Sequence, residues 1–317
     1  MADIARRFNL EMLTLTGPIE PGLAAQGVDV DRDTEFMALV EPDTVRDAYR
    51  LQMAADTPVL VTATRNITPA RLAHHNMEDR LEDLAVAAIT VARMVNPQHI
   101  LVEVGPCGLP LDQCSANSMK EHRDQYARVA RVFEAVDKPN TETNTTSFDG
   151  YLLTGFTSIA ALKAAIAGVR KISDKPIFAS VNVDDWGYLA PRGLETVEDA
   201  AAGAVELGAD VVGFSTAAAP EAAARIAARV ARVADVPVLV ELDITCLDRL
   251  SGSTFARRLS ADEVDNPYST PDAMLTAAAA LRQAGVQFLR AGGKASPAYT
   301  AVLAAATFGT DVVRKGE

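Results

Sequence analysis

The sequence of 317 residues is short of cysteine, of aromatic side chains and of positive charge. Its 3 cysteines cannot form a disulfide framework, so we expect a reducing, cytoplasmic setting. Aromatic residues make up only 5%, which leaves few side chains on which nucleic-acid bases could stack. The formal net charge of −12 repels phosphate backbones and anionic membranes. No apolar stretch reaches the roughly 18 residues that a membrane-spanning helix needs. These shortages exclude nucleic acids and membranes as expected partners.

What the sequence does contain is a regular alternation of two kinds of segment. Short apolar runs rich in β-branched residues are typical of strands that are covered on both faces. They occupy residues 12–16, 58–64, 99–105, 150–155, 176–183, 210–215, 237–243 and 286–292. Alanine-rich amphipathic segments with helix caps separate them, which predicts helices. These occupy residues 40–55, 80–95, 121–136, 158–172, 196–208, 220–234, 269–285 and 296–309.

The alternation indicates a parallel sheet with right-handed crossovers. Two architectures fit, a closed (β/α)₈ barrel and an open doubly wound sheet. Repeating units of roughly 35–40 residues suit closure. No GxGxxG sequence follows the first strand, which disfavours a dinucleotide-binding fold. We therefore predict an α/β protein with a single domain over residues 1–317, a (β/α)₈ TIM barrel.

In such a barrel the functional site lies at the carboxyl ends of the strands, and this rule selects the candidate residues by position. The polar residues predicted to bind substrate are Thr64, Glu103, Asn182, Asp184, Glu241 and Lys294. No residue qualifies as a nucleophile, because Ser215 lacks the second glycine of a nucleophile elbow.

Most of these candidates also have a structural interpretation. Glu241 and Arg290 on neighbouring strands could form an ion pair, since a buried acid must be paired. Asn182 and Asp184 could cap a loop instead of holding a ligand. The glycine turn before Lys294 opens a helix, so it could bind an anion or be only a tight turn.

The cysteines give a weak metal signal. Neither a CxxC nor an HxxxH sequence is present. Cys107 and Cys246 both follow predicted strands, and with an acid they could bind a metal at the barrel mouth. Idle thiols are the favoured interpretation.

Several longer segments resemble a known family. They are LTLTGPIEPGLAAQGVD, VEPDTVRDAYRLQMAADTPVLVTAT, ILVEVGPCGLPL, FDGYLLTGFTSIAALKAAI, ADVVGFSTAAAPE and FLRAGGKASPAYTAVLAA. Their order resembles the homocysteine S-methyltransferase family, and the resemblance extends over most of the chain. It implies a (β/α)₈ barrel that uses zinc to bind a thiol and methylates it.

The departures from the family fall on functional positions. Ser215 stands where the family has a zinc cysteine, and Lys294 and Ala295 stand where it has a cysteine pair. Thr16 and Thr154 replace two acids of the family, the second of which helps to hold the amino acid. A zinc that activates a thiol needs soft thiolate ligands. Zinc is therefore not expected, and we hypothesise that the ammonium of Lys294 supplies the positive charge instead.

The resulting prediction is a methyltransferase-like enzyme with a divergent, zinc-free site that acts on a small polar substrate. The methyl donor stays open, and so does the oligomeric state, a homo-oligomer included. One alternative is a pterin-binding methyltransferase subunit, or one that docks a corrinoid protein. Another is a non-catalytic barrel that binds a small ligand.

Overall fold

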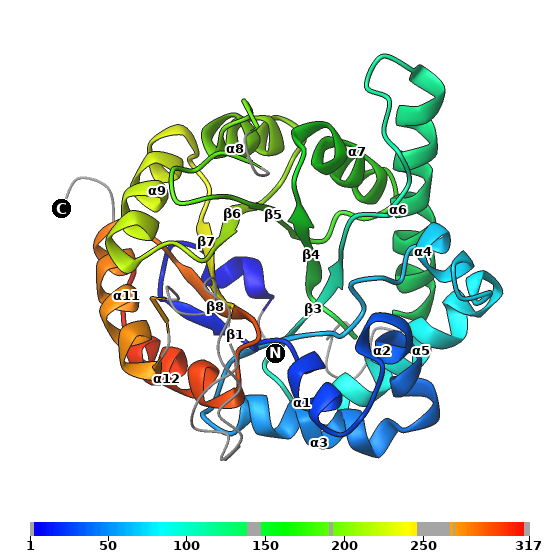
Figure 1. The fold of residues 1–317 in the computed structure, drawn as a ribbon, viewed down its shortest axis with the longest axis horizontal. Helices are drawn as coiled ribbons and strands as arrows, with labels where there is room; N and C mark the ends of the chain where they lie inside the picture. Colours follow the sequence, from blue (N-terminus) through cyan, green and yellow to red (C-terminus); the bar gives the residue numbers. More distant parts are fainter. Residues whose placement is uncertain (1–2, 138–146, 190–192, 246–266, 269, 314–317) are drawn as a thin grey trace, which may run out of the picture.

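A computed structural model describes residues 3–137, 147–189, 193–245, 267–268 and 270–313. Eight parallel strands form a closed barrel in the order of the sequence, each hydrogen-bonded to the next, with β8 paired to β1 (Figure 1). The strands are β1 (Leu13–Leu15), β2 (Val59–Val61), β3 (His99–Val104), β4 (Gly150–Phe156), β5 (Ile177–Asn182), β6 (Val211–Thr216), β7 (Val238–Ile244) and β8 (Phe288–Gly293). The predicted barrel is confirmed, with a strand in each of the eight predicted runs.

Helices surround the barrel in a ring (Figure 1). Those that match the predicted segments are α3 (Pro42–Met53), α5 (Leu81–Arg93), α6 (Ala116–Val136), α7 (Ile159–Arg170), α8 (Val197–Glu206), α9 (Pro220–Val233), α11 (Pro271–Gln283) and α12 (Pro297–Thr307). Elements that were not predicted are η1 (Ile4–Arg7), α1 (Glu20–Ala25), α2 (Val30–Val40), α4 (Pro69–Ala73) and η2 (Glu78–Arg80). None of the described helices combines the length and the apolar character that crossing a membrane requires.

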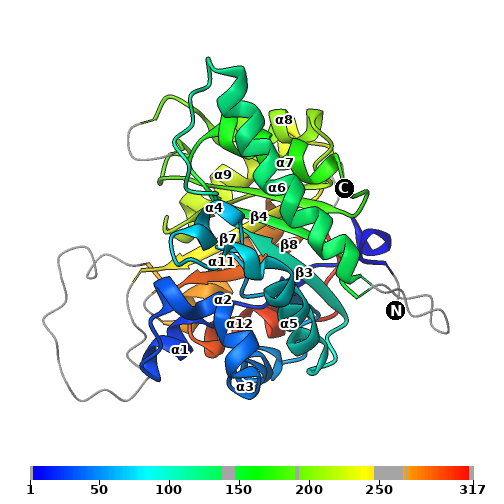
Figure 2. The ribbon, with the colours of Figure 1, turned by 90° about the vertical axis from the view of Figure 1, so that its right-hand side faces the viewer.

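An apolar core fills the end of the barrel interior that lies at the amino ends of the strands. Because side chains alternate along a strand, every second residue points inward. The inward cluster consists of Ile4, Leu13, Leu15, Val59, Val61, Leu101, Leu152, Phe178, Val211, Leu239 and Phe288. The ring of Phe8 contacts the rings of Phe178 and Phe288 edge-on, with centroids 5.9 Å apart in each pair. Figure 2 shows η1, the first helical turn, on the opposite side of the barrel from α1. This turn and the aromatic rings next to it therefore close that end of the barrel and form its floor.

A polar layer lies above this core, toward the carboxyl ends of the strands. The strand register places Asn182 beside Ser215, Ser215 beside Glu241, and Glu241 beside Arg290. These four positions follow the inward apolar residues Phe178, Val211, Leu239 and Phe288 on the same strands. The fold therefore brings polar side chains from β5 to β8 to one level at the mouth.

Candidate active site at the barrel mouth

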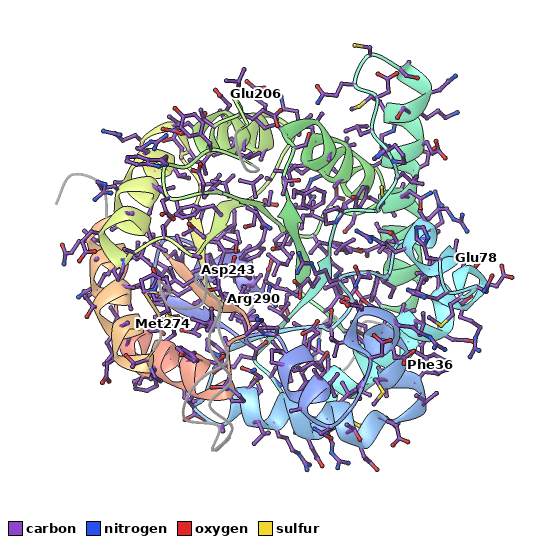
Figure 3. The ribbon with its side chains drawn as sticks, viewed as in Figure 1. Phe36, Glu78, Glu206, Asp243, Met274 and Arg290 are labelled. Carbon is purple, nitrogen blue, oxygen red and sulfur yellow. The ribbon has the colours of Figure 1, made fainter. Side chains whose placement is uncertain are left out.

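Arg290 is the centre of the polar layer, and Figure 3 shows it near the middle of the ring. Its Nη1 and Nη2 atoms each lie 3.0 Å from a carboxylate oxygen of Glu103. Nη1 also donates to Glu241 Oε2 at 2.8 Å, and Nε donates to the carbonyl oxygen of Thr16 at 3.1 Å. Burial lowers the pKa of Arg290, but the charges of Glu103 and Glu241 outweigh it and raise the pKa above its ordinary value. The guanidinium is therefore a permanent positive charge that is held between two carboxyl groups.

A pocket of about 370 Å³ opens directly above this ion triad. Its charged lining includes Glu20, Arg65, Arg71, Glu103, Glu241 and Arg290. These residues come from segments that follow β1 and β2 and from β3, β7 and β8 themselves. The pocket thus occupies the place where barrel enzymes bind substrate. The triad faces an open pocket, which favours a binding site over an inert structural core.

Glu20 supplies an unpaired acid to the pocket. It is the first residue of α1, and its Oε2 atom is buried without a hydrogen-bond partner among the described residues. Burial raises the pKa of Glu20 above its ordinary value, and the charge of Glu103 adds to the increase. Arg290 and Arg65 act in the opposite direction but do not cancel the shift. The carboxyl group therefore holds a proton more tightly than an exposed glutamate does.

Arg65 follows β2 and is held in place on both sides of its backbone. Its carbonyl oxygen accepts from the amide of Gly105 at 2.7 Å, and the next amide, of Asn66, donates to Glu35 Oε1 at 2.6 Å. The side chain lies against two glycines. A Cβ atom on Gly105 would lie 2.8 Å from Arg65 Cγ, and one on Gly155 would overlap Nη2. Both glycines are therefore needed for this position of the guanidinium.

Asp243 forms a second group with Ser215 and Glu241. Ser215 Oγ donates to Asp243 Oδ2 at 2.6 Å. The other oxygen, Oδ1, and Glu241 Oε1 converge on Gly292, where an added Cβ would lie 2.6 Å from each. Burial raises the pKa of Asp243 to about 7, and the charge of Glu241 adds to this effect. Asp243 is thus a carboxyl group that gains and loses its proton near neutral pH.

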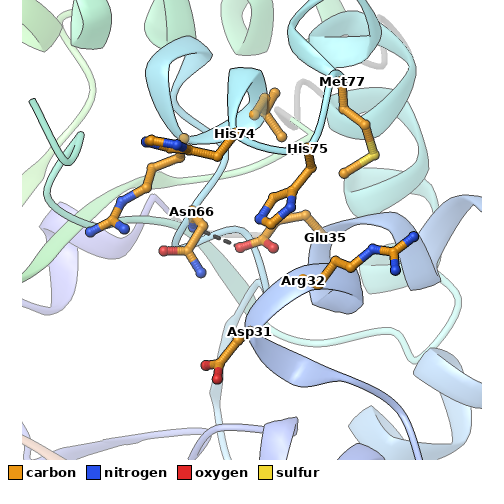
Figure 4. Close-up of a pocket in the computed structure, with 9 residues that line it drawn as sticks. Asp31, Arg32, Glu35, Asn66, His74, His75 and Met77 are labelled. Carbon is orange, nitrogen blue, oxygen red and sulfur yellow. Dashed lines mark hydrogen bonds between the residues drawn. The ribbon is translucent and has the colours of Figure 1, made fainter.

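A neighbouring pocket of about 410 Å³ shares Asp31, Asn66 and Arg71 with the first. Figure 4 shows the hydrogen bond between Glu35 and Asn66, with His74 and His75 among the other residues that line this pocket. Burial raises the pKa of Glu35 to about 7. Because Glu35 accepts from the amide that follows Arg65, it links the second pocket to the backbone in the wall of the first.

The structure brings two of the six predicted site residues, Glu103 and Glu241, into the pocket wall. Thr64 does not line this pocket: its hydroxyl is buried, donates to the carbonyl oxygen of Glu103 at 2.8 Å and pairs with the hydroxyl of Thr62 at 2.6 Å. Asp184 Oδ1 accepts two loop amides at 2.9 Å, which is the loop-capping arrangement. Contact of Thr64 or Asp184 with substrate stays a prediction.

Asn182 and Lys294 also lie outside the lining of this pocket. Asn182 is half-buried at the end of β5, at the level of Ser215. Lys294 is exposed, and its backbone amide donates to the carbonyl oxygen of Ile244 at 2.7 Å. Their roles in substrate binding stay predictions. Sequence reasoning missed Glu20, because helix α1 was not foreseen, and it gave no role to Arg65, which directly follows the predicted strand 58–64.

The sequence profile of the homocysteine S-methyltransferase family matches residues 13–307. The chain belongs to this family. Two structures of the homocysteine methyltransferase MmuM from Escherichia coli have the same fold, each with 15% sequence identity over 93% of this chain. The metallated form has a TM-score of 0.65 with 96% of its chain covered, and the oxidized form 0.69 with 95% covered.

A more distant match is the carboxyl transferase domain of Rhizobium etli pyruvate carboxylase with 3-bromopyruvate. It has 10% identity, a TM-score of 0.51, and coverage of 94% of this chain and 47% of that one. At these identities the structural likeness concerns the barrel fold. No curated protein matches the sequence.

The zinc that the family resemblance implies does not fit the side chains of this member. The hydroxyl of Ser215, at the position of a zinc cysteine, is bonded to Asp243, and the cysteine pair is replaced by Lys294 and Ala295. Within the described ranges, no three His, Cys, Asp or Glu side chains are grouped to hold a metal ion. Cys107 is buried, and Cys246, its partner in the alternative metal site, lies outside the described residues. A hydroxyl and an ammonium group cannot replace thiolate ligands.

Proposed function

We propose that the chain is a methyltransferase with a zinc-free site that acts on a small polar substrate. The observation that carries this proposal is the pocket of about 370 Å³ above the buried triad of Arg290, Glu103 and Glu241. A pocket of this size suits a small molecule. Its lining of charged side chains suits a polar substrate rather than an apolar one.

Proton removal from the methyl acceptor is the step for which the site has a suitable group. In a methyl transfer, the acceptor atom forms a bond to the methyl carbon, and the bond from that carbon to the donor breaks with its electron pair. An acceptor that carries hydrogen must also lose a proton. Asp243, with a pKa of about 7 and its Oδ1 turned toward Gly292, can accept this proton at neutral pH. Asp243 does not line the pocket itself, but its Oδ1 lies beside Gly292, which does. Asp243 would thus act as general base from behind this glycine, with Ser215 holding its other oxygen.

A labelled-methyl assay tests this function. Purified protein would be treated with a strong chelator and incubated with S-adenosylmethionine or methyltetrahydrofolate carrying a heavy methyl group. The acceptors would be homocysteine and a mixture of small polar metabolites, and mass spectrometry would detect labelled products. We expect transfer to persist with the chelator and to fall about 100-fold or more in Asp243→Asn, the loss typical of a missing general base.

Each other outcome points to a different function. Transfer that needs added zinc contradicts the zinc-free site. Transfer that occurs only with an added methylated corrinoid protein indicates a subunit of a larger system. Saturable binding of a metabolite without any transfer indicates a non-catalytic binding barrel.

A further inference from the structure

The side chains of Glu241 and Asp243 on β7 enclose a small hollow beside Gly292 on β8. The strand register pairs Asp243 with Gly292, and Gly292 lines the mouth pocket. At the place where another residue would have its Cβ atom, Glu241 Oε1 and Asp243 Oδ1 both lie 2.6 Å away. This place is too narrow for a carbon atom. A hydrogen-bond donor needs about 2.7–3.2 Å to each oxygen, so a ligand nitrogen fits after a small outward shift.

Each of the two carboxyl groups uses only its other oxygen within the protein. Glu241 Oε2 accepts from Arg290 Nη1 at 2.8 Å, and Asp243 Oδ2 accepts from Ser215 Oγ at 2.6 Å. Among the described residues, none donates to Glu241 Oε1 or Asp243 Oδ1, the two oxygens that face Gly292. The hollow thus presents two acceptor oxygens to a ligand in the mouth pocket.

A third acceptor oxygen belongs to the same pocket. Glu20 lines the pocket, and its Oε2 atom is buried without a hydrogen-bond partner in the described part of the chain. A buried oxygen without a partner gains a hydrogen bond when a ligand donor reaches it. In the ion triad, one guanidinium faces the two carboxyl groups of Glu103 and Glu241, so the triad is negative when all three groups are ionised. The pocket therefore favours a ligand that brings N–H groups and positive charge.

The hollow discriminates between acceptor groups by their hydrogens and their charge. A thiol is a weak donor, and it attacks a methyl group as a thiolate, which two carboxyl groups repel. A hydroxyl group has a single hydrogen and cannot donate to both oxygens at once. An ammonium group has three hydrogens, and both carboxyl groups attract its charge. An amine is therefore the acceptor that suits this place.

We propose that the methyl acceptor is an amine, which binds in the hollow at Gly292 as an ammonium group held by Glu241 Oε1 and Asp243 Oδ1. This inference rests on the proposed function for the reaction and adds the class of the acceptor. The donor is a methylsulfonium compound. One ammonium proton passes to Asp243, which gains and loses its proton near neutral pH, and this frees the lone pair of the nitrogen. The lone pair forms the bond to the methyl carbon, while the carbon–sulfur bond breaks and its electron pair stays on the sulfur of the leaving thioether.

The labelled-methyl assay distinguishes the acceptor atoms directly. The donor is S-adenosylmethionine with a heavy methyl group. The acceptors are 2,4-diaminobutanoate, homocysteine and homoserine, which carry an amine, a thiol or a hydroxyl group at the same carbon, and the mixture of small polar metabolites. Fragmentation in the mass spectrometer places the label on nitrogen, sulfur or oxygen. We expect label on nitrogen, with at least about ten-fold more product from the labelled amine than from its thiol counterpart. Label on sulfur or oxygen overturns the proposal.

Calorimetric titration without any methyl donor tests binding apart from transfer. The probes are again 2,4-diaminobutanoate, homocysteine and homoserine. We expect the amine to bind at least about ten-fold more tightly than the other two, as an added charged contact predicts. If 2,4-diaminobutanoate gives no heat, the amines of the metabolite mixture replace it. Failure of every amine to bind overturns the proposal.

Two variants of nearly unchanged shape assign the two contacts. Glu241→Gln and Asp243→Asn each remove one negative charge and keep an oxygen that accepts from Arg290 or Ser215. Each should weaken the binding of the amine about ten-fold or more and change the affinity for homoserine by less than about two-fold. Circular dichroism checks that both variants are folded. Equal losses for the amine and homoserine, or no loss, contradict the assignment.

Glu206→Gln is the matched control. Glu206 is exposed at the end of α8 in the outer ring of helices, away from Arg290 and Asp243 (Figure 3), and its replacement removes the same charge. It should leave all three affinities unchanged. Amine binding that depends on Glu241 and Asp243 without methyl transfer would overturn the proposed function alone. Methyl transfer to sulfur, or amine binding that is insensitive to both variants, would overturn the amine proposal alone.

Discussion

Arg290 on β8 and Glu103 on β3 form a two-pronged ion pair across the barrel interior, although their strands are not neighbours. Both nitrogen-to-oxygen distances are 3.0 Å, and both side chains are buried. Glu241 on the adjacent strand β7 contacts the same guanidinium at 2.8 Å. The ion triad thus links three strands of the wall below the pocket.

Replacing Arg290 with methionine should strongly destabilise the protein. The substitution leaves Glu103 and Glu241 close together without a cation, and breaking a buried pair costs about 3–5 kcal/mol. Urea unfolding followed by circular dichroism measures the free energy of unfolding. The control is the triple variant Arg290→Met, Glu103→Met and Glu241→Met, which removes all the charges and should recover most of the loss. An Arg290→Met protein as stable as the natural one would contradict the role of the triad.

Glu35 should make stability depend on pH. Burial raises its pKa in the folded state from 4.5 to about 7, so the folded protein binds the proton more tightly than the unfolded chain does. The stability that this proton contributes is complete below about pH 4.5 and is lost as the pH rises through 7. In Glu35→Gln the side-chain oxygen can still accept a hydrogen bond from the amide of Asn66, but the side chain cannot ionise.

The stability of Glu35→Gln relative to the natural protein should therefore increase between pH 5 and pH 8, by roughly 3 kcal/mol at most. Unfolding curves at several pH values measure this difference. Asp243 titrates in both proteins and cancels in the comparison. A difference that stays constant with pH would show that Glu35 does not titrate in this range.

Two glycine substitutions should have opposite effects. Gly22 lies within α1, and an added Cβ would meet nothing within 4 Å. Gly22→Ala should therefore stabilise the protein by about 0.5–1 kcal/mol, because alanine favours helices. Gly292→Ala would place a Cβ 2.6 Å from oxygens of Glu241 and Asp243 and should destabilise by roughly 1–3 kcal/mol. Thermal unfolding of both variants checks the signs, and equal shifts would contradict the crowding at Gly292.

Restoring the three cysteines of the family should create a zinc site. In Ser215→Cys, Lys294→Cys and Ala295→Cys combined, three thiolates replace a hydroxyl, an ammonium and a methyl group. We expect one zinc per chain by mass-spectrometric metal analysis after dialysis, and no stoichiometric zinc in the natural protein. Equal zinc in both proteins would mean that the natural chain binds the metal with other residues.

The sequence predicted the barrel because each strand leaves a local signal. The eight apolar runs are continuous, and their spacing sets the repeat. Helix α6 begins at Ala116 rather than near residue 121, because the side chain of Ser115 accepts from the amide of Ser118 and caps an earlier turn. Helix α1 lies in a segment that was compared with the family, and α2 follows directly after that segment, but neither was given a helix in the prediction.

The site was harder to predict because its contacts join distant segments. The pairing of Glu241 with Arg290 follows from neighbouring strands and was foreseen as an alternative. The pairing of Arg290 with Glu103 depends on how the barrel closes, which no local pattern reports. The same holds for Arg65, whose position depends on glycines in β4 and after β3.

The aromatic floor formed by Phe8, Phe178 and Phe288 closes one end of the barrel interior, so a ligand can enter and leave only at the other end. A hydrated molecule cannot cross a layer of packed rings without losing its water, so this route is blocked for polar compounds. Substrate and product must therefore enter and leave through the same opening, at the carboxyl ends of the strands. The product must consequently dissociate before the next substrate molecule binds. Product that accumulates should therefore inhibit the reaction competitively with substrate.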